Sequence, residues 1–144
     1  MTVDSGVVQE RLRLIRDLLA DLDQVGVITA ERLTRDRIVR HAIERIMTQL
    51  VDLAVAINSH IAATVLGQAP ASYRESFGMA ARAGAVSEEL AAELAPSAGL
   101  RNVLTHEYVA VDLTLVAQAV PRAHAGFRRY VTEVARFIAT QFPG

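Results

Sequence analysis

Residues 101–108, Arg-Asn-Val-Leu-Thr-His-Glu-Tyr, carry most of the candidate chemistry of this chain. Arginine grips phosphate through a planar fork of N–H donors, and it keeps its charge at physiological pH. Histidine takes up or releases a proton near neutral pH. We therefore expect Arg101 and His106 to serve metal-free cleavage of an RNA phosphodiester, because RNA carries its own nucleophile, the ribose 2′-hydroxyl.

The expected reaction is a transesterification in which the 2′-hydroxyl attacks the adjacent phosphorus. His106 would take or give the proton, a contribution typically worth about two to four orders of magnitude in rate. Arg101 would stabilise the charge that grows on the phosphoryl oxygens. Asn102 lies four residues before His106, so on a helix it shares the same face and would hold the imidazole or a phosphate oxygen. This chemistry needs no metal and no cofactor.

The spacing of Arg101 and His106 sets a geometric condition on that reaction. Five residues separate the two side chains by about 140° around an ideal helix axis. Either the helix unwinds near Thr105, or a second copy of the chain completes the site across a two-fold axis. We expect both.

Composition predicts one helical domain over residues 1–144 with an aliphatic core. The chain is 51% hydrophobic but only 5% aromatic, with no Trp and no Cys. The lack of Cys excludes disulfides and thiolate metal sites and is typical of a reducing cytoplasm. The longest uncharged stretch, 53–73, holds too many polar residues for a membrane span. A net charge of −1 means that RNA binding requires a local basic patch.

Periodicity and capping residues predict about five helices in an antiparallel all-α bundle. We expect a first helix capped by Asp4 or Ser5 and a long second helix over 30–66. A short third helix is expected over 72–82, followed by Gly84, and a fourth starts after Ser87 and kinks at Pro96. The last helix is expected over 113–141, capped by Asp112 and bent at Pro121. The apolar stripe of the long helix is expected at Ile38, Ala42, Ile46, Leu50, Leu53 and Ile57.

The octet 101–108 resembles the R-x4-H-x-Y signature of the HEPN ribonuclease toxins, specifically the HepT-like (DUF86) branch. The likeness extends over most of the chain, with segments 72–77, 83–87, 99–100 and 111–112 in the order familiar from that branch. It implies a helical homodimer whose motifs meet in a composite cleft, and a toxin that cuts RNA. By this resemblance Arg101 and His106 are the catalytic pair, and Asn102 is their polar neighbour.

The same resemblance implies a regulatory partner. The family is paired with a minimal nucleotidyltransferase (MNT) antitoxin that adds AMP to the motif tyrosine, here Tyr108. Added bulk and negative charge would block a site that must accept anionic RNA. RNA, the antitoxin and a second copy of the chain are therefore the implied partners, including a hetero-oligomer with the antitoxin, and no membrane is implied.

Two other groups of polar residues have ordinary interpretations. Arg37 and Arg40 belong to a run of alternating charges, which usually forms a solvated, salt-bridged face, although they could extend a phosphate-binding groove. His41 and Glu44 are three residues apart and could face one metal ion. A metal site in a bundle needs a second matching pair, which the sequence does not offer, so we predict no metal.

Two less specific functions compete with the nuclease. A helical subunit that binds a nucleotide or a substrate for a nucleotidyltransferase would also use Arg101 and Tyr108, without cleaving RNA. The near-neutral charge favours it slightly. A plain dimeric assembly module would make the octet incidental. Cleavage of RNA separates the first interpretation from the other two.

Overall fold

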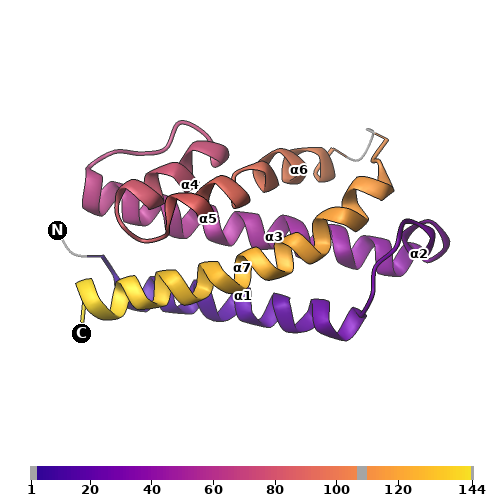
Figure 1. Ribbon diagram of the computed structural model, residues 1–144, viewed down its shortest axis with the longest axis horizontal. Coiled ribbons are helices and arrows are strands. Elements are labelled where there is room, and N and C mark those ends of the chain that lie inside the picture. The colour runs from indigo at the N-terminus through magenta and orange to yellow at the C-terminus, as the bar shows by residue number, and fades with distance from the viewer. Residues whose placement is uncertain (1–2, 107–109, 144) are drawn as a thin grey trace.

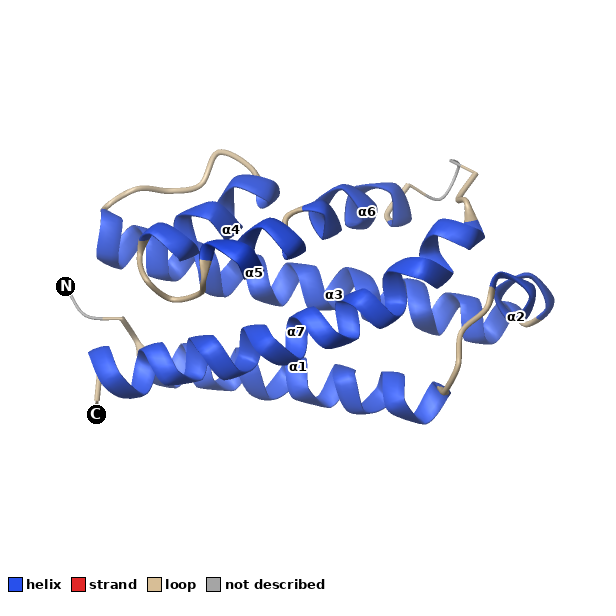
Figure 2. Cartoon of the chain, viewed as in Figure 1, coloured by secondary structure: helices blue, strands red, loops and turns tan. Residues whose placement is uncertain are grey.

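The computed structural model describes residues 3–106 and 110–143, and its regular elements are all helices (Figures 1 and 2). They are α1 (Ser5–Val25), α2 (Ala30–Arg35), α3 (Arg37–Ile61), the π-helical turn η1 (Ala62–Leu66), α4 (Tyr73–Arg82), α5 (Glu88–Leu94), α6 (Pro96–Leu104) and α7 (Leu113–Gln141). The predicted all-α class is confirmed.

Three long helices form the body of the bundle. α1 packs against α3 and α7 and runs antiparallel to both (Figure 1). The shorter helices α4, α5 and α6 follow one another along the opposite side, where α4 and α6 contact α3 and α5 contacts α7. The C-terminal end of α6, the start of α7 and the start of α3 all lie at the same end of the molecule (Figure 1).

Helix starts are where the sequence predictions succeed best. Asp4 caps α1 by accepting from the Val7 N–H, and Asp112 caps α7 by accepting from the N–H groups of Thr114 and Leu115. Such carboxylates satisfy N–H groups that have no partner within the helix. The predicted bounds of the last helix, 113–141, agree with α7. Pro121 lies inside it, and the first turns of α7 run at an angle to the rest (Figure 1).

The predicted helix over 30–66 is wrong as a single element. Asp36 adopts an extended backbone conformation, and its carboxylate accepts from the N–H groups of Ile38 and Val39, so it ends α2 and starts α3. Because Ile38 then falls in the first turn, it is 77% exposed instead of facing the core. The last turn, η1, is π-helical and not α-helical.

Pro96 also acts differently from the prediction. It does not kink one helix but begins a new one: α5 ends at Leu94 and α6 starts at Pro96. Proline suits the first position of a helix because that N–H has no partner there in any case. The bundle therefore has more and shorter helices than the expected five.

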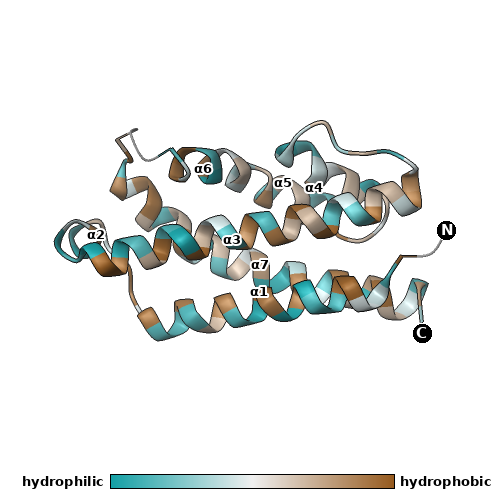
Figure 3. Ribbon diagram, turned by 180° about the vertical axis from the view of Figure 1, so that it is seen from behind, coloured by the Kyte–Doolittle hydropathy of each residue, from teal (hydrophilic) through white to brown (hydrophobic). Residues whose placement is uncertain are grey.

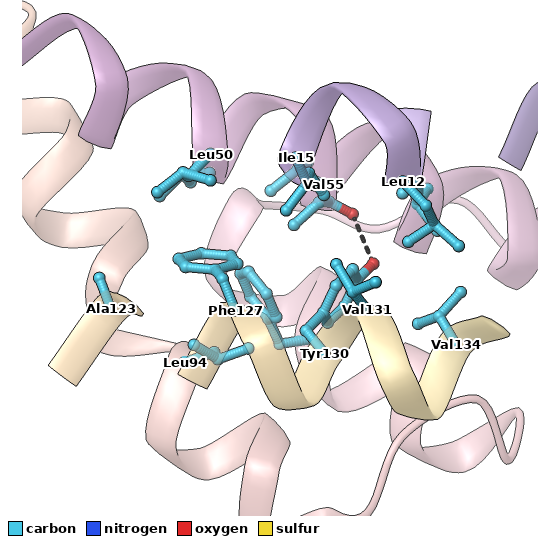
Figure 4. Close-up of a cluster of buried hydrophobic side chains, with 14 of the residues drawn as sticks. Leu12, Ile15, Leu50, Val55, Leu94, Ala123, Phe127, Tyr130, Val131 and Val134 are labelled. Atoms are coloured by element: carbon cyan, nitrogen blue, oxygen red, sulfur yellow. Dashed lines mark hydrogen bonds between the residues drawn. The ribbon is translucent and has the colours of Figure 1, made fainter. Parts of the chain in front are cut away.

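The core is aliphatic with a small aromatic centre. Apolar faces of the helices turn inward (Figure 3), and the predicted stripe is buried at Ile46, Leu50 and Ile57. The fully buried Tyr130 ring meets Phe77 and Phe127 edge-on, with centroids 6.5 and 6.2 Å away. Figure 4 shows Phe127 and Tyr130 between Leu94 and the residues of α1 and α3.

The helical stretch Arg37–Leu66 is long and apolar enough to cross a membrane, judged by length and composition alone. A core helix passes the same test because its buried face is apolar. α3 has contacts with α1, α2, α4, α6 and α7, and its buried residues belong to the hydrophobic core. Its hydropathy is therefore explained by packing within the bundle.

Candidate functional site

Arg101 projects from α6 onto two neighbouring helices. Its Nε donates to Oδ1 of Asp52 on α3 over 2.8 Å. The Cζ atom of its guanidinium lies 4.9 Å from the centroid of the Tyr73 ring on α4, within the range of a cation–π contact. Three helices thus meet around one cation.

The bond to Asp52 uses one of the five N–H donors of the guanidinium. The other four, on the two Nη atoms, form the edge that binds a phosphate in arginine–phosphate pairs. The side chains of Arg101 and Asp52 are 25% and 37% exposed. A partly exposed pair of this kind stabilises a fold by only about 0.2–1 kcal/mol. Its main effect is on the orientation of Arg101.

Asp52 was missed in the sequence analysis, although the sequence holds a signal for it. It is the only charged residue between Arg45 and Arg74. A lone carboxylate in an uncharged stretch of a core helix favours a charged partner, because burying an unpaired charge is costly. The sequence alone did not reveal which cation that partner would be.

The helix that carries the motif ends inside the motif. α6 ends at Leu104, and Thr105 is its C-cap, with φ −86° and ψ −6°. The His106 N–H donates to the Val103 carbonyl over 3.2 Å, a tight turn that leaves the α-helical path. The prediction that the helix unwinds near Thr105 is confirmed.

The predicted catalytic residues point to different sides of α6. Arg101 lies on the side that faces α3 and α4, together with the half-buried Leu104. Asn102 is exposed on the outer side, and His106 is exposed beyond the end of the helix. Since α6 ends before His106, the shared face expected for Asn102 and His106 on a continuous helix does not apply. Tyr108, the predicted modification site, lies outside the described residues.

The weaker candidates Arg37 and Arg40 stand at the first turn of α3. Arg37 is exposed, and the Nε of Arg40 lies 3.5 Å from Oε1 of Glu44. Asp52 follows them by 15 and 12 residues, or roughly 22 and 18 Å along the helix axis. The two arginines therefore lie too far away to share a phosphate with Arg101 in the same protomer.

The remaining histidines have structural contacts. His60 Nε2 accepts the N–H of Asp4 over 3.0 Å, which ties the chain before α1 to the end of α3. His124 Nε2 lies 2.8 Å from Oδ1 of Asp23, linking α7 to α1. Among the described residues, no three His, Cys, Asp or Glu side chains gather as a metal site would require, and His41 is exposed.

Comparison with known sequences gives two similarities over most of the chain. The family described as "HepT-like: Ribonuclease HepT-like" matches residues 9–134. The tRNA nuclease HepT of Aphanizomenon flos-aquae (strain 2012/KM1/D3) is 27% identical over 138 residues, which are 96% of this chain and 94% of the relative.

Solved structures share the fold at low identity. The tri-AMPylated HEPN toxin of Shewanella oneidensis, solved with its MNT antitoxin, superposes with a TM-score of 0.80 at 19% identity, covering 90% of this chain and 97% of the toxin. The cytosolic protein YutE of Bacillus subtilis, of unknown function, gives a TM-score of 0.83 at 16% identity, covering 99% and 95%. At these identities the likeness shows the common helical fold.

Proposed function

The chain belongs to the HepT-like ribonuclease family, and from this membership we propose that it is the toxin of a toxin–antitoxin pair, an endoribonuclease that cleaves RNA without a metal. The single observation that carries the proposal is the setting of Arg101. A carboxylate and an aromatic ring hold its guanidinium at the end of a helix that stops two residues before His106. The relative named as a tRNA nuclease adds support for RNA as the substrate.

In the proposed reaction the ribose 2′-oxygen bonds to the adjacent phosphorus, and the bond from phosphorus to the 5′-oxygen breaks. His106 accepts the proton of the 2′-hydroxyl or donates one to the departing 5′-oxygen. Arg101 binds the phosphoryl oxygens through its Nη donors as their charge grows. Asn102 holds the imidazole or a phosphate oxygen in place.

This route makes two checks available. The cleaved RNA should carry a 2′,3′-cyclic phosphate and a 5′-hydroxyl, and EDTA should leave the rate unchanged. Ends of the opposite kind, a 5′-phosphate and a 3′-hydroxyl, would show that water or another external nucleophile attacks, and the mechanism would be wrong.

We further propose that Arg101 of one chain and His106 of a second chain serve the same phosphodiester in a two-fold homodimer. Within one protomer the Arg101 side chain turns toward α3 and α4, whereas His106 stands beyond the helix end. Two copies related by a two-fold axis would bring each helix end toward the other copy's guanidinium. The exposed Arg37 and the half-buried Arg40 would then extend the groove for the RNA.

Mixing two inactive variants tests the shared site. In a dimer of one Arg101→Ala chain and one His106→Ala chain, one cleft keeps an intact arginine and an intact histidine. Co-refolding the two variants in equal amounts should restore about a quarter of the wild-type cleavage, since half of the dimers are mixed and each has one working cleft. If each protomer holds a complete site, mixing restores nothing.

The test of the activity itself is growth arrest and RNA cleavage on expression. His106→Ala should abolish both, with wild-type protein as the reference. Purified protein that binds nucleotides yet leaves cellular RNA intact would favour the alternative, a non-catalytic binding subunit of a nucleotidyltransferase complex.

The partner we propose is an MNT antitoxin that attaches AMP to Tyr108. The tri-AMPylated toxin solved with its MNT antitoxin supports this assignment. Phosphate groups added beside the motif would repel RNA and occupy its place. The mass of the protein, measured after co-expression with a nucleotidyltransferase, should show AMP-sized additions. These additions should be absent from the Tyr108→Phe variant. Additions that persist in this variant would place the modification on another residue.

A further inference from the structure

We propose that Tyr73 is a positioning residue for Arg101, kept in place by a buried chain of hydrogen bonds that begins at Tyr130. The inference rests on the proposed function in taking Arg101 as the phosphate-binding group. Its structural basis is the position of the guanidinium over the Tyr73 ring, with 4.9 Å from Cζ to the ring centroid.

The first turn of α4 holds Tyr73 at its first position. Ser72 Oγ accepts from the Glu75 N–H over 3.0 Å, and Glu75 Oε2 accepts from the Ala71 N–H over 3.2 Å. These reciprocal bonds resemble a capping box, which fixes where a helix begins. The start of α4 cannot slide along the chain without breaking both bonds.

A chain of buried polar groups ties the same turn to the centre of the bundle. The Tyr130 hydroxyl on α7 donates to Asn58 Oδ1 on α3 over 2.6 Å. Asn58 Nδ2 donates to Ser76 Oγ over 3.2 Å, and the Ser76 hydroxyl donates to the Tyr73 carbonyl over 2.7 Å. Each donor meets an acceptor, so the chain runs in one direction from α7 to Tyr73.

The burial of this chain makes the position of α4 specific. Tyr130, Asn58 and Ser76 are fully buried. A shift of α4 along α3 would leave Asn58 Nδ2 without its acceptor in the core, where an unsatisfied polar group is costly. Apolar packing alone would tolerate small shifts, whereas this network permits one register, and in that register the Tyr73 ring covers Arg101.

Asp52 and Tyr73 constrain the guanidinium in complementary ways. The Asp52 carboxylate holds Nε through a hydrogen bond, and the Tyr73 ring holds the centre of the guanidinium, with Cζ over the ring. Together they determine where the Nη edge points before RNA binds. A fork that is already oriented loses little freedom when it engages phosphate, so the ring should act mainly on kcat and less on KM.

The experiment compares Tyr73→Leu with Tyr73→Phe, which keeps the ring. Phe142→Leu is the matched control, because it removes another half-buried ring, one that packs on Phe137 with centroids 5.5 Å apart. The first readout is kcat and KM for RNA cleavage. The second is the Nε–H signal of Arg101 in a ¹⁵N spectrum, assigned by its loss in Arg101→Lys, which reports the bond to Asp52 without any need for activity.

Tyr73→Leu should lower kcat roughly 3- to 30-fold, the range of one cation–π contact, and weaken the Nε–H signal. Tyr73→Phe and Phe142→Leu should leave both unchanged. Equal behaviour of Tyr73→Leu and Phe142→Leu in both readouts would overturn the inference. If wild-type protein does not cleave RNA, the proposed function fails, and the Nε–H signal still decides whether Tyr73 positions Arg101.

Ser76→Ala tests the buried chain, since it keeps the ring and removes the bond to the Tyr73 carbonyl. Ser76→Ala should weaken the Nε–H signal of Arg101 as Tyr73→Leu does. If Ser76→Ala does not fold, Tyr130→Phe is measured in its place. An unchanged signal in the folded variant would remove the buried chain from the proposal.

Discussion

Arg101 and His106 are five residues apart in sequence, yet their surroundings differ sharply. Arg101 touches a carboxylate of α3 and a ring of α4, so tertiary contacts within one protomer determine its direction. His106 is exposed past the end of α6, and its backbone follows a tight turn. The two halves of the predicted motif are thus positioned by different parts of the structure.

This difference suggests a division of labour between the two regions. Arg101, for which we propose phosphate binding, is already held by contacts within the fold, and such preorganisation lowers the entropy lost on binding. His106, for which we propose proton transfer, lies beyond the end of α6, where we also propose that AMP addition and a second copy act. Regulation at the exposed region would leave the preformed region intact.

Substitution of His106 should give the largest effect and separate the two regions most clearly. His106→Ala should lower RNA cleavage by about 10²- to 10⁴-fold, the loss typical of a general acid or base. Because the side chain is exposed, the free energy of unfolding in urea should stay within about 0.5 kcal/mol of wild type. A large loss of stability would show that His106 is structural.

Loss of the Tyr130 hydroxyl should lower the stability of the fold much more than the rate of RNA cleavage. Tyr130→Phe leaves Asn58 Oδ1 without its donor in the core, which should cost about 1–3 kcal/mol of unfolding free energy. Cleavage per folded molecule should fall much less than in His106→Ala. Urea titration with parallel activity measurements checks both expectations, and a variant as stable as wild type would contradict the first.

The same residue should make the fold sensitive to alkali. Burial raises the pKa of Tyr130 well above its ordinary value. A raised pKa means that the hydroxyl contributes full stability below about pH 10, where the unfolded tyrosine titrates, and loses it progressively above. The 15 basic residues of the chain are all arginines, so no lysine obscures this range. The fall of unfolding free energy above pH 10 should be shallower in Tyr130→Phe.

Removal of Asp52 should produce a smaller effect confined to the site. Asp52→Ala frees the guanidinium to rotate and should reduce kcat about tenfold, with stability reduced by at most about 1 kcal/mol because the pair is partly exposed. Asp52→Asn keeps an oxygen acceptor and is the matched control, expected to retain more activity. Full activity in Asp52→Ala would mean that the carboxylate does not orient Arg101.

The smallest effect is expected at the first turn of α3. Replacing Arg37 and Arg40 together by Ala should weaken RNA binding modestly and reduce the slope of log K against log salt by about 0.7 for each phosphate that the protein no longer neutralises. Binding measured between low and moderate salt checks this. An unchanged slope would assign both arginines to an ordinary solvated face.

The sequence predictions were most accurate for interactions between residues that lie close together in the sequence. Asp4 and Asp112 bond to N–H groups two or three residues away, so local sequence was enough to place the starts of α1 and α7. The end of α6 near Thr105 was predicted from the spacing of two residues. Asp36 acts by an equally local bond, but the strong apolar periodicity on either side of it concealed the break.

The contacts around Arg101 could not be predicted in this way. Asp52 and Arg101 are 49 residues apart, and Tyr130 and Asn58 are 72 apart. Nothing in the spacing of such distant residues reports which helix faces which. The octet could therefore be singled out for its chemistry, while the partners that hold it were out of reach.

By itself, the sequence determined the helical class, the starts of the first and last helices, and the motif for which we propose phosphate binding and proton transfer, because periodicity, capping and side-chain chemistry are local properties. Only the tertiary structure decided that α3 supplies a carboxylate and α4 a ring to Arg101. The packing of three helices around a buried polar chain permits one register, and that register is a property of the whole fold.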